Sequence, residues 1–224
     1  MKSCQGSPLL PKLQQIQEEP VDYSPITTEG LGEFTPGSFA SRCKERLGQG
    51  AYASIAYHYK LKKLIGKGEG ALVYKAVNYT SQEEVSIKVL FDIGRSEVAL
   101  RAAIRELSIM RQFSAMGGYA HTVPLLYAFT SKEENGRLQL ILITEYIHRG
   151  DMERYLNKKE RDPITSRCVL KLVYSLLCLL KFMHSAGVIH RDIHPKNLLL
   201  TSESRLLLND FGLARSLRVA SKDQ

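Results

Sequence analysis

The segment at 190–210 carries three side chains whose types suit phosphoryl-transfer chemistry. Asp192 and Asn197 stand five residues apart in His-Arg-Asp-Ile-His-Pro-Lys-Asn, and Asp210 comes eighteen residues after Asp192. One carboxylate can act as a base, while an amide oxygen and a second carboxylate can hold Mg²⁺. Each aspartate alone would more often be an ordinary loop or turn residue, but their joint spacing with Asn197 predicts phosphoryl transfer from Mg-ATP.

A glycine-rich segment and a lysine upstream suit the same chemistry. Gly66, Gly68 and Gly70 are separated by single residues, and Lys88 follows Gly66 by twenty-two residues. Glycines let backbone N–H groups approach phosphates closely. Such a segment alone is weak evidence, because it also suits a hairpin, and a strand lysine is commonly an edge residue. A second glycine segment at 48–52 has no lysine-bearing strand at the right interval and is expected to form a loop.

Glu106 is the expected partner of Lys88. The residues at helical spacing around Glu106 are the apolar Ala102, Ala103, Ile109 and Met110. A carboxylate on such a helix face needs a cation, because an unpaired buried charge is costly. Glu97 is the alternative partner, but it has fewer apolar neighbours.

Hydrophobic patterns predict an α+β fold in which a β-rich region precedes a helix-rich one. The expected strands are 59–65, 72–78, 84–91, 123–130 and 137–145. The expected helices are 96–113, 151–157 and 165–186. The last helix is apolar on nearly all sides, so we expect it to need more cover than the chain offers.

Together, the glycine segment, Lys88, Glu106 and the motifs at 190–197 and 210–212 resemble the eukaryotic protein kinase fold, over roughly residues 58–215. Ala-Ile-Arg-Glu-Leu at 103–107 resembles Ser/Thr kinases of the mitogen-activated and cyclin-dependent branch. The resemblance implies a small β-rich N-lobe with one long helix and the hinge at 58–147, and a partial, mainly helical C-lobe at 148–224. It also implies a protein Ser/Thr substrate, and an activating kinase, cyclin or docking protein as partner.

The resemblance assigns roles to single residues, with ATP and Mg²⁺ as cofactors. Asp192 would accept the proton of the substrate hydroxyl, and Lys88, held by Glu106, would contact the α and β phosphates. Asn197 and Asp210 would hold Mg²⁺. The residues expected around the nucleotide are Ile65, Gly66, Lys67, Gly68, Gly70, Ala71, Val73, Ser86, Lys88, Thr144, Glu145, Ile147, Asp151 and Leu199.

Three positions depart from the family pattern. Ala71 replaces the third glycine, Ser86 replaces the alanine under the adenine, and His194 stands where this branch has a catalytic-loop lysine. A neutral imidazole would lose a fixed positive charge near the transferring phosphate, so slower transfer is expected. No Ala-Pro-Glu motif follows Arg215. We therefore expect an incomplete kinase domain, with a catalytically impaired nucleotide-binding pseudokinase or scaffold module as the alternative.

Composition sets the remaining expectations. Residues 1–57 are expected to be a disordered extension, because five of the eight prolines lie in the first 36 residues among Ser, Gln, Glu and Thr. The apolar run at 172–183 is interrupted by Ser175 and Lys181 and is expected to be too short to cross a membrane.

The net charge is +8, but the basic residues are scattered, so no nucleic-acid partner is expected. Four cysteines without Cys-x-x-Cys spacing indicate a reducing compartment, cytoplasmic or nuclear.

Overall fold

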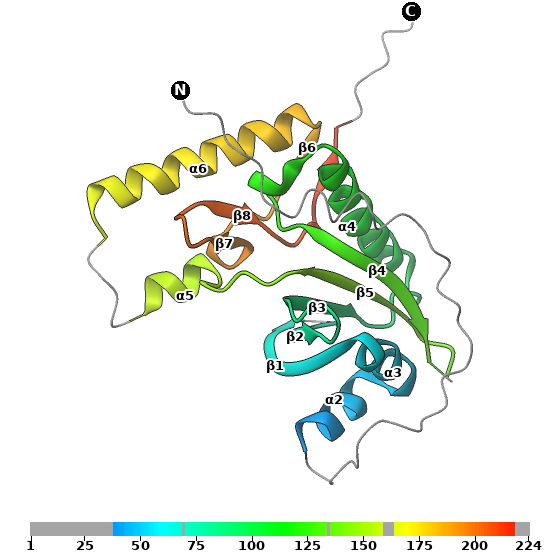
Figure 1. Cartoon of the computed structure of the whole chain (residues 1–224). Helices are drawn as coiled ribbons and strands as arrows, with labels where there is room; N and C mark the ends of the chain where they lie inside the picture. The colour runs from blue at the N-terminus through cyan, green and yellow to red at the C-terminus, as the bar shows by residue number, and fades with distance from the viewer. Residues whose placement is uncertain (1–37, 69, 134, 159–163, 218–224) are drawn as a thin grey trace, which may run out of the picture. The chain divides into compact units, whose positions relative to one another are not determined.

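A five-stranded antiparallel sheet forms the first half of the fold (Figure 1). The computed structural model describes residues 38–68, 70–133, 135–158 and 164–217. The strand order of the sheet is β1-β2-β3-β5-β4. The strands are β1 (Tyr59–Gly68), β2 (Ala71–Asn78), β3 (Glu84–Leu90), β4 (Leu125–Lys132) and β5 (Leu138–Glu145). All five predicted strands are present, and the α+β prediction is confirmed.

Alternate residues of β5 enter two different hydrophobic cores. Leu140 and Leu142 belong to a core that contains Phe113 of α4 (Glu97–Ala115). Ile141 and Ile143 belong to a second core on the other face of the strand. The alternation follows from the strand period of two residues. Because β5 is buried on both faces, it holds the two cores together.

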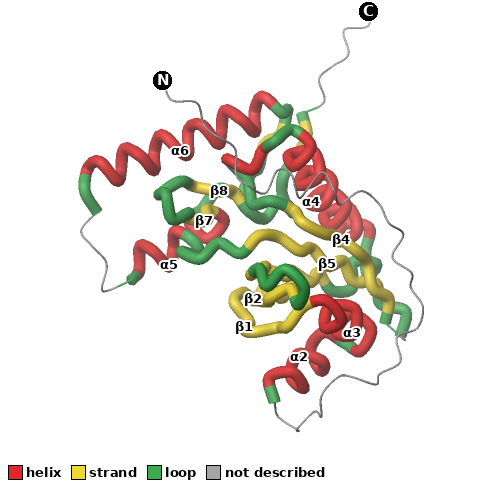
Figure 2. Tube along the Cα trace, in the orientation of Figure 1, coloured by secondary structure: helices red, strands yellow, loops and turns green. Residues whose placement is uncertain are grey.

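The second core includes a pair of helices that precede the sheet (Figure 2). These are α2 (Phe39–Leu47) and α3 (Gln49–His58), which meet at Gly48 with a φ of 80°. The pair contributes six buried apolar side chains to the core, namely Cys43, Leu47, Ala51, Tyr52, Ile55 and Ala56. The prediction of disorder is therefore wrong for residues 38–57, and the predicted loop at 48–52 is wrong because α3 begins at Gln49. Residues 1–37 lie outside the described part of the chain.

Two side chains, Glu133 in the β4–β5 turn and Gln139 at the start of β5, attach the helix pair to the sheet. Glu133 accepts a hydrogen bond at Oε1 from the main-chain N–H of Ala51, in the first turn of α3, at 3.4 Å. Gln139 donates from Nε2 to the main-chain oxygen of Leu47, at the end of α2, at 2.9 Å. Both contacts satisfy backbone groups that a helix end leaves without intrahelical partners. The helix pair is thus tied to the sheet by polar as well as apolar contacts.

The second half of the fold contains two predicted helices and a set of short strands. The helices are α5 (Met152–Asn157) and α6 (Ser166–Ser185), whose ends agree with the prediction to within a residue. The short elements of this half are β6 (Val188–Ile189), η2 (Pro195–Asn197), β7 (Leu198–Leu200), β8 (Leu206–Leu208) and β9 (Arg215–Ser216), while the short helix η1 (Gly118–Ala120) lies between α4 and β4. Strands of two or three residues are too short to show an alternating pattern, so they could not be predicted from the sequence.

Helix α6 is buried along one line only. Leu179 and Met183 are fully buried and join the core that contains β8, while Leu170 is 70% exposed and Leu177 is 59% exposed. Among the described helices, α6 alone has the length and apolar composition that crossing a membrane would need. The run at 172–183 is thus part of a 20-residue helix, and the length argument against a membrane span does not hold. Core helices of soluble proteins satisfy the same two criteria.

Candidate active site

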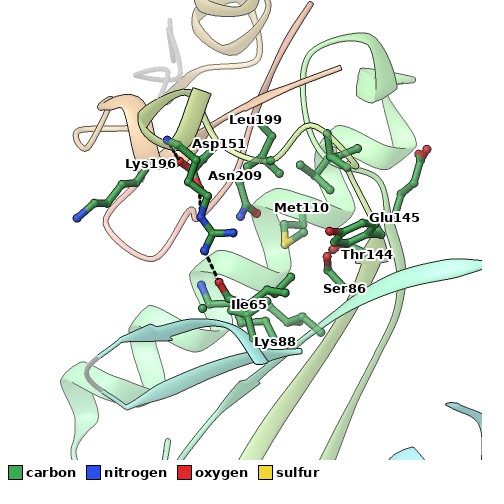
Figure 3. Close-up of a pocket in the computed structure, with 18 of the residues that line it drawn as sticks. Ile65, Ser86, Lys88, Met110, Thr144, Glu145, Asp151, Lys196, Leu199 and Asn209 are labelled. Carbon is green, nitrogen blue, oxygen red and sulfur yellow. Dashed lines mark hydrogen bonds and ion pairs between the residues drawn. The ribbon is translucent and has the colours of Figure 1, made fainter. Parts of the chain in front are cut away.

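A cleft lies between the sheet and the segment that follows it (Figure 3). Residues of β1, β2, β3 and β5 line one side, and Gly150, Asp151 and Leu199 line the other. The cleft has a volume of about 170 Å³ and is open to solvent. Its lining combines apolar side chains with a few polar and charged ones, as ligand-binding clefts commonly do.

Lys88 lies in the cleft because of the alternation of β3. Its neighbours Ile87 and Val89 are buried in the core, so Lys88 points to the opposite face. Lys88 Nζ lies 2.7 Å from Oε1 of Glu106 and 3.1 Å from Oδ1 of Asp210. Burial alone would lower the pKa of Lys88, but the two carboxylates outweigh this effect and raise the pKa above its ordinary value. The structure therefore holds a fixed ammonium charge in the cleft.

The backbone at Asp210 is strained. Asp210 has a φ of 64°, in the left-handed region that non-glycine residues seldom adopt. The next residue, Phe211, is fully buried, and its ring makes edge-on contacts with Phe113 of α4 and His190. Burial by itself would raise the pKa of Asp210, but Lys88 reverses this effect and lowers it. The packing of Phe211 thus holds an ionised carboxylate beside Lys88.

Asp192 and Asn197 meet in the loop before β7. Asn197 donates from Nδ2 to the main-chain oxygen of Asp192 at 2.9 Å and to its Oδ2 at 3.1 Å. Its Oδ1 therefore remains as an acceptor. His194 Nε2 lies 3.6 Å from the same Oδ2 of Asp192. The Asp192 side chain is 41% exposed, so a substrate hydroxyl could reach it.

His190 holds this loop through both ring nitrogens. Its Nε2 lies 3.2 Å from the main-chain oxygen of Asn209, and its Nδ1 lies 3.3 Å from the N–H of Asp192. A neutral ring with the proton on Nε2 satisfies both contacts, because Nδ1 must accept. Burial lowers the pKa of His190, which is consistent with the neutral form. His190 therefore positions Asp192 and the residue before Asp210 together.

Comparison with known proteins identifies the family. The sequence model described as "Protein kinase domain" matches residues 59–224. The chain belongs to the protein kinase family. Mitogen-activated protein kinase 15 of Mus musculus is 35% identical over 164 residues, which are 73% of this chain and 28% of that protein. Extracellular signal-regulated kinase 2 of Dictyostelium discoideum is 33% identical over 159 residues, which are 71% of this chain and 40% of that protein.

These relatives confirm the predicted family, a Ser/Thr kinase of the mitogen-activated branch. The kinase chain spans well under half the length of both relatives. Its helix pair α2–α3 ends at His58, so it lies before the matched region. The helix pair is therefore an addition to the part of the chain that the family model describes.

The structure brings most of the predicted site residues of the kinase to one cleft. Those that line it are Ile65, Gly66, Val73, Ser86, Lys88, Glu106, Thr144, Glu145, Ile147, Asp151 and Leu199. Those that lie outside its lining are Lys67, Gly68, Gly70, Ala71, Asp192, His194, Asn197 and Asp210. Asp210 nevertheless contacts Lys88. Ser86 faces Thr144 across the β3–β5 ladder, so the slot between Val73 and Leu199 has a polar side.

Several residues of the kinase site were missed in the sequence. The unpredicted lining residues are Met110, Val123, Leu142, Gly150, Arg154, Lys196 and Asn209, whereas Tyr146 lies between the predicted hinge residues Glu145 and Ile147. Arg105 donates to the main-chain oxygen of Gly212 at 2.9 Å, and Arg191 donates to that of Leu213 at 2.8 Å, so both hold the segment after Asp210. Arg105 lies one residue before Glu106, and this adjacency was the available signal.

The residues present fit Mg-ATP. Gly70 has a φ of 76°, and a Cβ at Gly68 or Gly70 would meet nothing within 4 Å, so the described residues leave open space around both glycines. Asn197 Oδ1 and the Asp210 carboxylate are the oxygen donors that Mg²⁺ prefers. Among the described residues no group of three or more His, Cys, Asp or Glu could hold a metal. An Asn–Asp pair suits Mg²⁺ that takes its remaining ligands from phosphates and water.

Proposed function

We propose that this kinase domain binds Mg-ATP in the cleft and transfers the γ-phosphoryl group to a Ser or Thr hydroxyl of a protein. One observation carries the proposal: Lys88 Nζ lies 2.7 Å from Glu106 and 3.1 Å from Asp210. The fixed ammonium group of Lys88 suits contacts with phosphate oxygens, and the exposed carboxylate of Asp210 beside it suits their metal ion. The mitogen-activated protein kinase relatives support a protein substrate and regulatory protein partners as further parts of the proposal.

Each residue of the site would then have one task. Bound Mg-ATP would supply the phosphoryl group and, through its metal, neutralise the developing charge. Lys88 would donate to phosphate oxygens, while Glu106 keeps its ammonium group in place. Asp192 would orient the substrate hydroxyl and accept its proton, and Asn197 fixes the Asp192 carboxylate through Nδ2.

Substitution of the base tests the transfer step. We expect Asp192→Asn to leave the Kd for Mg-ATP within about twofold, because Asp192 meets the hydroxyl rather than the nucleotide. Transfer to a generic basic protein should fall by about 10²-fold or more, the usual contribution of a general base. Asp92→Asn is the matched control, since Asp92 pairs with Arg137 and does not line the cleft. Equal losses in binding and turnover would show that Asp192 is not the base.

A second candidate function is nucleotide binding without transfer. It is favoured by His194, whose imidazole stands 3.6 Å from Asp192 where the related kinases are expected to have a lysine. The same experiment distinguishes the two functions. Mg-ATP binding without transfer by the unmodified chain supports the second candidate, and absence of Mg-ATP binding rejects both.

A further inference from the structure

One arginine connects two sides of the cleft. Arg154 lies in α5, and its Nη2 donates to the main-chain oxygen of Ile65 in β1 at 2.6 Å. Its Nε lies 3.2 Å from Oδ2 of Asp151. All three residues line the cleft. The guanidinium group therefore joins the sheet to the segment after the hinge, although 63% of the side chain is exposed.

An irregularity in β1 turns the Ile65 oxygen toward Arg154. The β1–β2 register shifts between Leu64 and Gly66, so Ile65 has no partner residue on β2. An extra residue in one strand leaves its backbone groups outside the regular ladder. Because Ile65 directly precedes Gly66, a side chain that binds its oxygen also restrains the start of the glycine segment.

Asp151 fixes the direction of the Arg154 side chain. Oδ1 of Asp151 accepts a hydrogen bond from the main-chain N–H of Arg154 at 2.8 Å, and Oδ2 pairs with Nε. The Asp151 side chain is only 17% exposed, and Asp151 also bridges to Leu199 of β7. The planar guanidinium group directs its donors at fixed angles, so one edge meets Asp151 while Nη2 meets Ile65.

The two sides of the cleft are joined at its back as well as at its mouth. At the back, Lys88 contacts Asp210 at 3.1 Å, and Arg105 donates to Gly212 at 2.9 Å. At the mouth, the contact of Arg154 is a single exposed hydrogen bond. Such a bond breaks and reforms easily in water, so it suits a closure that opens without disturbing the back of the cleft.

We infer that Arg154 is a positioning residue that straps the glycine segment to α5 and sets how fast a nucleotide enters and leaves the cleft. The inference rests on the proposed function for the identity of the ligand. This strap is the hydrogen bond between Arg154 and the main-chain oxygen of Ile65, and it forms both before a nucleotide binds and over the bound nucleotide. It therefore slows association and dissociation by the same factor and leaves the Kd nearly unchanged.

Stopped-flow fluorescence tests this inference on the full 224-residue chain. The probe is a fluorescent N-methylanthraniloyl derivative of ATP with Mg²⁺. We expect Arg154→Ala to raise the association and dissociation rate constants alike, by roughly three- to tenfold, the effect of one hydrogen bond. Arg154→Lys keeps the charge but loses the planar fork, so its rates should fall between those of the wild type and Arg154→Ala.

Arg149→Ala is the matched control. Arg149 is also an exposed arginine that donates to a main-chain oxygen, that of Thr201, but it does not line the cleft. Its removal should leave both rate constants unchanged. A change in only one rate constant of Arg154→Ala, or in neither, overturns the inference, because a direct contact with the nucleotide would act on dissociation alone.

A second readout separates failure of the strap from failure of the proposed function. In the nucleotide-free chain, amide hydrogen exchange at Gly66–Gly68 should be faster in Arg154→Ala than in the wild type, while exchange in the core strand β5 stays unchanged. Unchanged exchange at Gly66–Gly68 overturns the strap. If the wild type binds no fluorescent nucleotide, the proposed function fails, and the strap is then decided by the exchange measurement.

Discussion

At the scale of single residues, one ammonium group and two carboxylates set the charge inside the cleft. Glu106 and Asp210 lie far from Lys88 in the chain, yet an oxygen of each carboxylate lies within 3.1 Å of Lys88 Nζ. The pairing of Lys88 with Glu106 was predicted, because an unpaired charge on an apolar helix face needs a partner, whereas the contact of Lys88 with Asp210 was not. Arg154 gave no such signal, since its contact with Ile65 depends on a strand irregularity and on the closeness of two distant elements.

His194 stands where the family pattern has a lysine, and this difference leads to a prediction about the rate of phosphoryl transfer. His194→Lys would place a permanent positive charge beside Asp192 and the transferring phosphate. We expect phosphoryl transfer at saturating Mg-ATP to rise by roughly tenfold, less than the 10²–10³-fold effect of a well-aligned donor in an oxyanion hole. His184→Lys adds the same charge in the last turn of α6 and should have no effect. An unchanged or lower rate in His194→Lys would mean that the His194 imidazole already supports phosphoryl transfer as well as a lysine would.

At the scale of elements, long patterned segments were predictable and short ones were not. The five strands and the helices α4, α5 and α6 follow from periods of two and 3.6 residues. The pair α2–α3 was not predicted. The proline-rich composition of the first 36 residues indicated disorder, and the glycines at 48 and 50 indicated a loop. The signal was present nonetheless, since Cys43, Leu47, Ala51 and Ile55 recur every fourth residue.

Packing of the helix pair leads to a prediction about stability. Ile55 is fully buried in the core beneath the sheet. Ile55→Ala should lower the free energy of unfolding by about 2–5 kcal/mol, through lost burial and a residual cavity. Ser54→Ala, at the exposed neighbouring position, should change it by less than about 0.5 kcal/mol. Urea unfolding measures both variants, and equal stabilities would contradict the docking of α3 on the sheet.

At the scale of the whole molecule, the described fold leaves one large apolar surface uncovered. The exposed face of α6 consists of Val169, Leu170, Val173, Tyr174 and Leu177. The sequence predicted a helix apolar on nearly all sides, and the structure shows which side is buried, through Leu179 and Met183. A contiguous exposed apolar patch favours association with other apolar surfaces.

The exposed α6 face should make the chain bind a hydrophobic dye and self-associate. The double variant Leu170→Glu, Leu177→Glu should reduce dye fluorescence and shift sedimentation toward the monomer. Lys171→Glu introduces an acidic group on the same helix without removing an apolar side chain, and should have a smaller effect. A wild-type chain that sediments as a monomer and binds no dye would contradict this prediction.

The central claim is that Mg-ATP binds in the cleft through Lys88, and thermal unfolding tests it most directly. A ligand that binds only the folded state stabilises it by about 2.7 kcal/mol at a hundredfold excess over its Kd, so the Tm of the wild type should rise with Mg-ATP concentration. Lys88→Met should abolish this rise, whereas Lys60→Met, at an exposed position of β1, should preserve it. Equal stabilisation of Lys88→Met and the wild type by Mg-ATP would contradict the account.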